Sequence, residues 1–312
     1  MIDVLEITKN RLSKNSELTK NYELFINEIR EIMQELTLPC LSKNNFFDNN
    51  AFQGGTALRV LYGLKRYSKD LDFSMKENKI NEFSWQTYIN KIKEYGNTLG
   101  IKFDCKESKD KFGNVILRIK SDSILEMLDK MPDKEKIVPI EFTNKNNRKK
   151  ASIKLETNYS VNTFNDEIKT VKYDTEYNIR AFDLPSLFAG KINAVLTREE
   201  TNELTGNKEK IDNGRDWYDL VWYIDKGIKP NYSFLSDKIN YKGPFAGKHI
   251  QTDVEWVKKE LFYRMQDIDY NIINEDIASI TLKENRIILT KDLLIEKINK
   301  FGRSDNWSGT LS

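Results

Sequence analysis

Residues 53–76, which read QGGTALRVLYGLKRYSKDLDFSMK, constrain the fold of this chain more than any other stretch. Gly54 and Gly55 follow a predicted strand over residues 50–53, and glycines there let the backbone turn sharply and approach a ligand closely. Thr56 then opens a predicted helix, because the apolar residues after it recur every three to four positions. A helix N-terminus after such a turn offers free N–H groups and a positive dipole end. The turn is therefore a candidate site for the phosphates of a nucleotide.

Two carboxylates follow in a second predicted strand, Asp70-Leu71-Asp72-Phe73. Side chains at i and i+2 of a strand share a face, so Asp70 and Asp72 point the same way while Leu71 and Phe73 point into a core. In a phosphate-handling site the cation for such a pair is Mg²⁺, which binds through one or two carboxylates together with substrate oxygens. Either motif alone is common, but their joint order and spacing are far more specific.

The combined run resembles the signature of the AbiEii-type toxins, a branch of the nucleotidyltransferase superfamily. In that signature Gly-Gly or Gly-Ser and Thr precede Arg-x-Ser-x-Asp-Leu-Asp-Phe, which begins here with Arg66 and Ser68. The resemblance spans roughly residues 45–225, with a lysine helix and an Arg-Asp-x-x-Asp-Leu element further along. It implies that Arg66 and Ser68 bind nucleotide together with Gly54, Gly55 and Thr56.

Length and charge limit the organisation of the chain. A chain of 312 residues fits two domains better than one core. Lys and Arg number 50 against 48 Asp and Glu, so any site for a polyanion must be a local patch.

Cysteine usage and hydropathy bear on location. Cys40 and Cys105 are the only cysteines and lie far apart, which favours a reducing compartment. The first residues lack the pattern of a secretory leader, and no run approaches 18 apolar residues. We expect a cytoplasmic protein that does not enter a membrane.

The periodicity predicts an α/β (α+β) fold with a helical C-terminal domain. The resemblance implies that the mixed sheet is nucleotidyltransferase-like. Residues 1–182 would hold N-terminal helices and the sheet domain, and residues 183–312 the helical domain. Residues 38–50 are expected to be a loop, because they contain Pro39 and a run of Asn and Lys. Further strands are expected over residues 114–120 and 136–142.

Glu141 ends the second of these runs, where a third acid of a metal site would arrive on a neighbouring strand. The resemblance supports Glu141 as a metal ligand beside Asp70 and Asp72. The alternative is an edge strand, favoured by Pro139, with Glu141 in solvent.

A basic run follows Glu141 directly. Lys145, Arg148, Lys149, Lys150 and Lys154 occur with no acidic residue between Glu141 and Glu156. We expect a polyanion contact there. The alternative is a solvated loop, the commoner reading of a charge run.

A helix from Asp183 to about Arg198 is predicted by an N-cap candidate with proline in the first turn. Lys191 interrupts its apolar stripe, which by geometry favours a side chain that snorkels to water. The resemblance reverses this preference, because Lys191, Ala194 and Arg198 match the family's Lys-x-x-Ala-x-x-x-Arg pattern. It implies that Lys191 holds the triphosphate.

The Arg-Asp-x-x-Asp-Leu element is matched by Arg215, Asp216, Asp219 and Leu220. Asp216 and Asp219 lie three apart on one flank of a predicted helix. We favour Asp216 as the residue that faces the site, and Asp219 is assigned to nucleotide binding. The alternative is an ion pair between Arg215 and Asp219 within the helix.

Together these features predict a nucleotidyltransferase. A hydroxyl of the acceptor would attack the α-phosphorus of the NTP and release pyrophosphate. Glu141 or Asp216 would accept the proton of that hydroxyl. The resemblance implies an RNA acceptor, tRNA, and a toxin neutralised by a separate antitoxin. Two alternatives stay open: an antibiotic-type enzyme acting on a small molecule, and a non-catalytic nucleotide-binding module that acts through a protein partner.

Overall fold

The computed structural model describes residues 3–143, 151–159, 161, 163–173, 175–201, 208–210 and 213–303. Their Cα positions fall into two compact units. Unit 1 contains Met1–Tyr159, Glu167–Ala181 and Ile280–Asn285. Unit 2 contains Ser160–Asp166, Phe182–Ser279 and Arg286–Ser312. Neither unit is one continuous stretch of chain.

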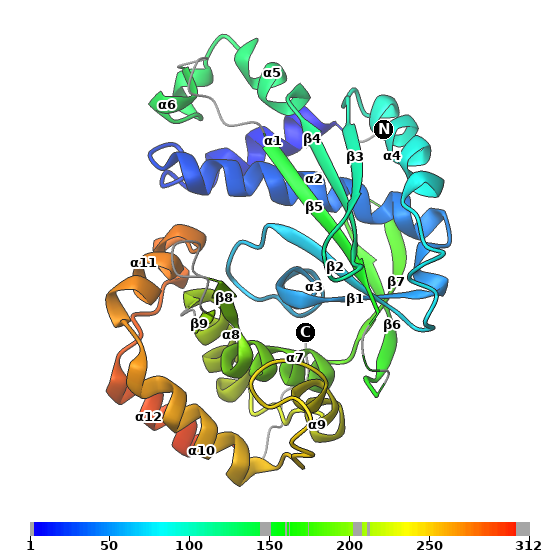
Figure 1. Ribbon diagram of the computed structural model, residues 1–312. Coiled ribbons are helices and arrows are strands. Elements are labelled where there is room, and N and C mark those ends of the chain that lie inside the picture. The colour runs from blue at the N-terminus through cyan, green and yellow to red at the C-terminus, as the bar shows by residue number, and fades with distance from the viewer. Residues whose placement is uncertain are drawn as a thin grey trace. The chain divides into compact units, whose positions relative to one another are not determined.

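A seven-stranded mixed sheet forms the centre of unit 1. Its strands are β1 Asn50–Gln53, β2 Asp70–Met75, β3 Asp104–Lys109, β4 Val115–Ser121, β5 Ala151–Asn158, β6 Asp166–Lys172 and β7 Glu176–Phe182. They lie in the order β3-β4-β5-β2-β1-β7-β6 (Figure 1). β2 runs antiparallel to β1 and parallel to β5, whereas β5, β4 and β3 are joined by antiparallel pairings. The sheet and its helices confirm the predicted α/β fold class.

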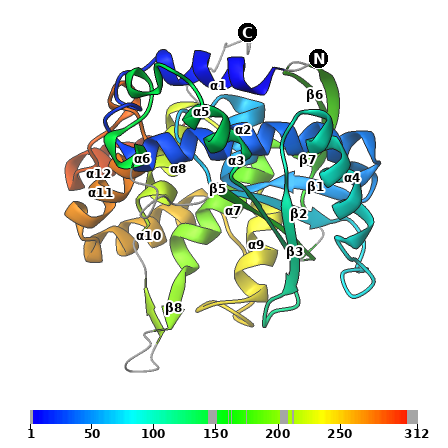
Figure 2. The same ribbon diagram turned by 90° about the horizontal axis from the view of Figure 1, so that it is seen from above.

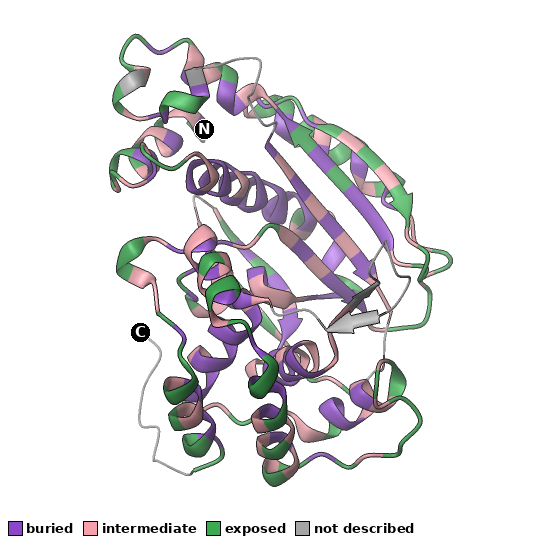
Figure 3. Ribbon diagram, turned by 60° about the vertical axis from the view of Figure 1, so that its left-hand side comes forward, coloured by how far each residue is buried: buried purple, intermediate pink, exposed green. Residues whose placement is uncertain are grey.

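Alternating burial along the strands separates two faces of this sheet. In β5 the residues Ile153, Leu155 and Thr157 are buried, and the residues between them are partly exposed. Leu71 and Phe73 of β2 are fully buried, as predicted. Figure 3 shows the same alternation of purple with lighter residues. The face opposite the buried one is called the open face.

Helices of unit 1 are α1 Val4–Ser13, α2 Tyr22–Lys43, α3 Gly54–Tyr62, α4 Gln86–Thr98, α5 Ser123–Asp129 and α6 Ile140–Thr143, with 3-10 turns at Phe46–Asp48, Lys134–Lys136 and Lys283–Asn285. α2 packs against β5, and α1 lies along α2 and α5 (Figures 1 and 2). Residues 24–29 and 31–41 of α2 are buried.

The loop expected from residue 38 is wrong over its first part, because α2 continues through Pro39 to Lys43. A proline inside a helix removes a hydrogen bond and costs about 3 kcal/mol. Leu36, Leu38 and Leu41 are at most 1% exposed, so their burial offsets this cost.

The strand expected over residues 136–142 is also wrong. The chain there makes tight turns and the short helix α6, and the Phe142 amide donates to the Pro139 carbonyl. The apolar run does not enter the sheet, because Ile140 is 85% exposed while Phe142 packs edge-on against Phe25 of α2. The strand beside β2 is β5 instead.

Unit 2 is mainly helical, as predicted. Its helices are α7 Leu184–Thr197, α8 Gly214–Asp225, α9 Tyr232–Tyr241, α10 Val254–Arg264, α11 Tyr270–Ile280 and α12 Lys291–Lys300, with a 3-10 turn at Met265–Asp267 and a hairpin of β8 Glu199–Thr201 and β9 Lys208–Lys210. The Asp183 carboxylate caps α7 by accepting from the Ser186 amide. This is the predicted N-cap, with Pro185 in the first turn.

No helix among the described residues combines the length and the apolar content needed to cross a membrane.

Candidate active site

Both glycines of the turn are required by close neighbours. Gly54 has a φ of +80°, and a Cβ built on it would lie 2.6 Å from Asp72 Oδ2. A Cβ on Gly55 would collide with the guanidinium of Arg66. The turn therefore brings the backbone against one of the predicted metal ligands, which only glycine allows.

Thr56 joins the turn to the carboxylate strand. Its side chain is fully buried, and its hydroxyl donates a hydrogen bond to the carbonyl of Asp70. The hydroxyl thus fixes the start of β2 against the first turn of α3. That turn has neither a side-chain cap nor an acidic residue, so the positive end of the helix dipole is not neutralised within α3.

Asp70 and Asp72 lie on the open face of β2 and are half-buried. In the sheet register Asp72 is opposite Gln53 of β1 on one side and Glu156 of β5 on the other. Asp70 is opposite Lys154 of β5. The strand geometry predicted for the carboxylate pair is therefore present.

Glu156 occupies the place that the sequence analysis gave to Glu141. Glu141 is exposed on α6, outside the sheet, so its position on a neighbouring strand is wrong. Glu156 shares the open face with Asp72 and accepts a hydrogen bond of 3.0 Å from Asn114 Nδ2. The alternation of Ile153, Leu155 and Thr157 is a strand pattern in the sequence, but it does not indicate which strand β5 pairs with.

Lys154 is the cation of this cluster. Its Nζ lies 3.0 Å from Glu156 Oε2 and 3.4 Å from Asp70 Oδ2. Burial by itself lowers the pKa of Lys154, but Asp70 and Glu156 outweigh burial and raise it above its ordinary value. Lys154 therefore stays charged at neutral pH. The rest of the predicted basic run, Lys145, Arg148, Lys149 and Lys150, lies outside the described residues.

The donor set fits a cation that shares its ligands with a substrate. Among the described residues, no three His, Cys, Asp or Glu side chains converge on one point to form an all-protein metal site. Mg²⁺ does not need such a cage, because one or two carboxylates and phosphate oxygens suffice. Asp70 and Asp72, two hard oxygen donors on one face beside the glycine turn, match that requirement.

Arg66 and Ser68 hold the connection between α3 and β2. Arg66 is buried, lies against Gly55, and donates from Nη1 to the Tyr67 carbonyl at 2.9 Å. The Ser68 carbonyl accepts a hydrogen bond of 2.7 Å from Gln34 of α2. Both residues therefore shape the loop that carries β2 to the glycine turn.

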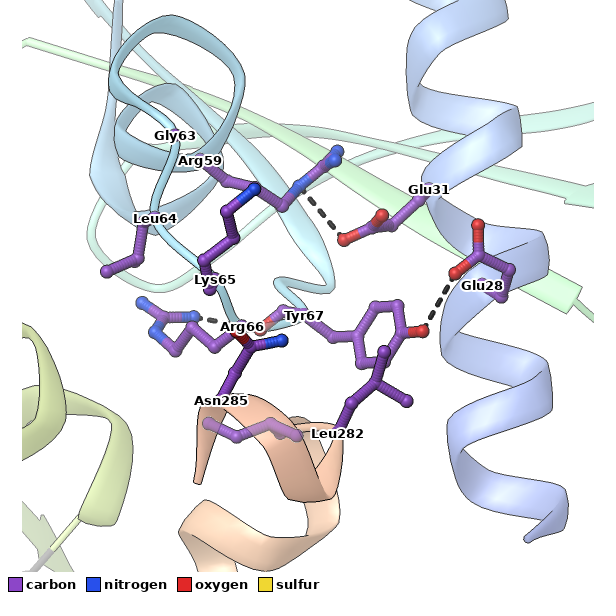
Figure 4. Close-up of a pocket in the computed structure, with 11 residues that line it drawn as sticks. Glu28, Glu31, Arg59, Gly63, Leu64, Lys65, Arg66, Tyr67, Leu282 and Asn285 are labelled. Atoms are coloured by element: carbon purple, nitrogen blue, oxygen red, sulfur yellow. Dashed lines mark hydrogen bonds and ion pairs between the residues drawn. The ribbon is translucent and has the colours of Figure 1, made fainter. Parts of the chain in front are cut away.

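A cavity of about 270 Å³ adjoins this loop (Figure 4). Arg59 and Arg66 line it together with Glu28 and Glu31 of α2 and Tyr67. Arg59 Nε lies 3.0 Å from Glu31, and the Tyr67 hydroxyl donates to Glu28 at 2.7 Å. Burial raises the pKa of Glu31 to about 8 against the opposing effect of Arg59. This cluster was not predicted from the sequence, although glutamates at spacings of three and four mark one face of α2.

A second ionic cluster lies within unit 2. Lys191 Nζ of α7 is 2.7 Å from Asp216 Oδ1 and 2.8 Å from Asp219 Oδ2, both on α8. Arg198 Nε adds a contact of 3.1 Å to Asp216. The side chain of Lys191 is 13% exposed and ends between two buried carboxylates, so it does not snorkel to water.

Electrostatics favour the ionised form of Asp216. Burial alone would raise the pKa of Asp216, but Lys191 and Arg198 outweigh it and hold that pKa below the ordinary value. Asp219 pairs with Lys191. Both aspartates thus converge on one lysine, from helix positions three residues apart.

The predicted residues therefore form two groups. Gly54, Gly55, Thr56, Asp70 and Asp72 meet within unit 1, and Lys191, Asp216 and Asp219 meet within unit 2. Glu141 joins neither group.

Solved structures similar to this chain include two from Helicobacter pylori. One, described as a "putative nucleotidyltransferase", has 16% sequence identity and a TM-score of 0.43, covering 86% of this chain and 89% of that chain. The other, JHP933, has 17% identity and a TM-score of 0.45, covering 88% of each chain. No curated protein matches the sequence.

A family model gives the assignment. The model described as "Nucleotidyl transferase AbiEii toxin, Type IV TA system" matches residues 37–287, most of the 312-residue chain. The matched range contains the glycine turn, the carboxylate pair and the lysine cluster. The chain therefore belongs to the AbiEii family of nucleotidyltransferase toxins of type IV toxin–antitoxin systems.

Proposed function

We propose that this nucleotidyltransferase moves a nucleoside monophosphate from an NTP to an RNA acceptor, tRNA, with Mg²⁺ as its cofactor. The observation that carries the proposal is the approach of Gly54 to Asp72, whose Oδ2 lies 2.6 Å from the position that a Cβ on residue 54 would take. It joins a backbone turn suited to phosphates with a carboxylate suited to a cation.

The NTP phosphates would lie on the N–H groups of Gly55 and Thr56, in the first turn of α3. Asp70 and Asp72 would hold the cation, which when bound neutralises charge on the phosphate oxygens during in-line displacement. Thr56 and Arg66 would position this site, since the Thr56 hydroxyl bonds the Asp70 carbonyl and Arg66 packs on Gly55. Ser68 would help to position the same loop.

Glu156 would take the role first assigned to Glu141. It lies across β2 from the glycine turn, because Asp72 has Gln53 on one side and Glu156 on the other. A hydroxyl that attacks opposite the leaving pyrophosphate would approach from the Glu156 side. We therefore propose that Glu156 accepts the hydroxyl proton.

Lys191, Asp216 and Asp219 remain proposed participants on the family pattern. Within unit 2 the two aspartates pair with Lys191 and hold its ammonium group in place, which suits a residue that binds a triphosphate. Asp216 is paired with two cations, so a positioning role suits it better than proton transfer.

The type IV family implies a separate antitoxin, and we propose that toxin and antitoxin meet in the cytoplasm.

The test is incubation with each α-labelled NTP, Mg²⁺ and total tRNA, followed by denaturing electrophoresis and a pyrophosphate assay. We expect labelled tRNA and pyrophosphate, both lost on chelation of the metal. Pyrophosphate released with an aminoglycoside but not with tRNA would support the antibiotic-type enzyme instead. Bound NTP without pyrophosphate would support the non-catalytic module.

A further inference from the structure

The open face of the sheet carries a row of cations that leads to the carboxylates. The register aligns Lys106 of β3 with Arg118 of β4, Arg118 with Lys154 of β5, and Lys154 with Asp70. Residues opposite each other on neighbouring strands point to the same face. Lys106, Arg118 and Lys154 are called the basic row. With strands about 4.8 Å apart, the basic row extends roughly 14 Å from Asp70.

The basic row is unfavourable for the isolated sheet, because like charges directly opposite each other on paired strands destabilise it. Asp104 shares this face of β3 with Lys106 and lies opposite Lys120 of β4. Lys106 and Arg118 are exposed and make no ion pair with any carboxylate in the described part of the chain, and the same holds for Lys120, two residues beyond Arg118 on the same face. Lys106 and Arg118 are neighbouring cations without a carboxylate partner among the described residues, and in a chain of net charge +2 they indicate a surface that meets a polyanion.

The basic row lies on the acceptor side of the proposed reaction. The glycine turn, which would hold the leaving phosphates, adjoins β2 from the β1 side. The basic row adjoins β2 from the β5 side. Attacking and leaving oxygens are in line at the phosphorus, so the acceptor arrives opposite the leaving group. The strands β5, β4 and β3 are therefore the approach for the acceptor.

An exposed aromatic ring stands at the hairpin between β3 and β4. Phe112 is 61% exposed. The hairpin is ordered by Asp110, whose Oδ1 accepts from the amides of Phe112 at 2.8 Å and Asn114 at 2.9 Å. Asn114 also donates to Glu156, which ties the hairpin to the candidate site. Cations combined with an exposed aromatic ring are typical of surfaces that bind single-stranded nucleic acid.

We propose that a single-stranded end of the RNA acceptor lies across β5, β4 and β3, with its phosphates on the basic row and a base stacked on Phe112. This inference rests on the proposed function, and it adds the surface that presents the acceptor hydroxyl to Asp70, Asp72 and Glu156.

The charge arm of the test compares two double variants. Lys106→Gln with Arg118→Gln removes two charges from the basic row. The matched control, Lys91→Gln with Lys109→Gln, removes two exposed charges from α4 and from the other face of β3. Affinity for tRNA and for a single-stranded RNA oligonucleotide is measured at several salt concentrations. Each lost phosphate contact flattens the slope of log K against log salt by about 0.7, so we expect a change of about 1.4 for the first variant only.

The stacking arm uses Phe112→Ala, Phe112→Trp and an exposed control, Tyr263→Ala, since Tyr263 is 66% exposed. Phe112→Ala should weaken RNA binding by about 5- to 160-fold at every salt concentration, because a lost stack carries no charge. Phe112→Trp should retain affinity, and RNA should quench its fluorescence. Affinity for NTP should stay unchanged in all of these variants.

The outcomes separate this inference from the proposed function. Wild-type protein that binds no RNA would overturn both. RNA binding by the wild type with equal slopes in both double variants, or with full affinity in Phe112→Ala, would overturn only the assigned surface.

Discussion

Replacement of Gly54 by alanine tests the active-site geometry most directly. A Cβ at this position would lie 2.6 Å from Asp72 Oδ2, whereas ordinary contact begins at about 3.4 Å, so the carboxylate and the turn must separate by about 0.8 Å. A displacement of about 1 Å in a catalytic constellation can cost about 100-fold in rate. We expect kcat/KM for nucleotidyl transfer to fall by about that factor.

The matched control is Gly63→Ala at the C-terminal end of α3. Gly63 has a φ of +74°, close to that of Gly54, but nothing lies within 4 Å of its Cβ position. Alanine in this left-handed region costs about 1–2 kcal/mol, part of which is offset by the stiffer unfolded chain. Both variants should therefore lose some stability, while only Gly54→Ala should lose the rate.

A double-mutant cycle separates the collision with Asp72 from backbone strain. The free energy of unfolding is measured by thermal or urea denaturation for Gly54→Ala, Asp72→Ala and the pair. Removal of the carboxylate relieves the collision, so the pair should be more stable than the sum of the single effects predicts. Additive stability effects, or equal transfer rates in Gly54→Ala and Gly63→Ala, would refute the reasoning.

Three other predictions follow from the two ionic groups and the carboxylate strand. Asp72→Asn should abolish pyrophosphate release while circular dichroism stays unchanged, because Leu71 and Phe73 keep β2 buried; full activity in Mg²⁺ would contradict the assignment. Lys191→Ala should lower the free energy of unfolding by about 3–5 kcal/mol, since it leaves two buried carboxylates without that partner. The control is Lys300→Ala, because Lys300 forms an exposed ion pair with Glu296. A loss of stability no larger than that of the control would argue against this prediction. The pKa of Glu31 is raised to about 8, so between roughly pH 4.5 and 8 this carboxyl is protonated in the folded state and ionised in the unfolded state. The free energy of unfolding therefore falls as pH rises through that window. Glu31→Gln should flatten this pH dependence of the melting temperature, and an unchanged pH profile would count against the raised pKa.

Local sequence was enough to predict the glycine turn and the carboxylate pair. Gly54, Asp70 and Asp72 lie in one short stretch, where helix and strand periods fix which side chains share a face. The same holds for Lys191, because its helix carries a recognisable N-cap and an apolar stripe.

The partner strand could not be predicted in the same way. Strand order depends on contacts between distant segments, and the apolar run before Glu141 resembled a strand as closely as β5 does. Burial decides between them, because Ile140 points to solvent while Ile153 and Leu155 enter the core. Glu156 was therefore missed, and with it the basic row, which exists only once β3, β4 and β5 are aligned.

The return of residues 280–285 to unit 1 has a consequence for synthesis of the toxin. The Tyr67 amide donates to the Ile280 carbonyl at 2.8 Å, and the Lys283 amide donates to Glu17 at 2.8 Å. A nascent chain of residues 1–182 already contains Gly54, Asp70 and Asp72, but it lacks the segment that closes the loop before β2. Unit 1 is thus completed only after residue 285 has been synthesised, and a chain terminated before residue 280 would carry every proposed metal ligand on an unfinished scaffold.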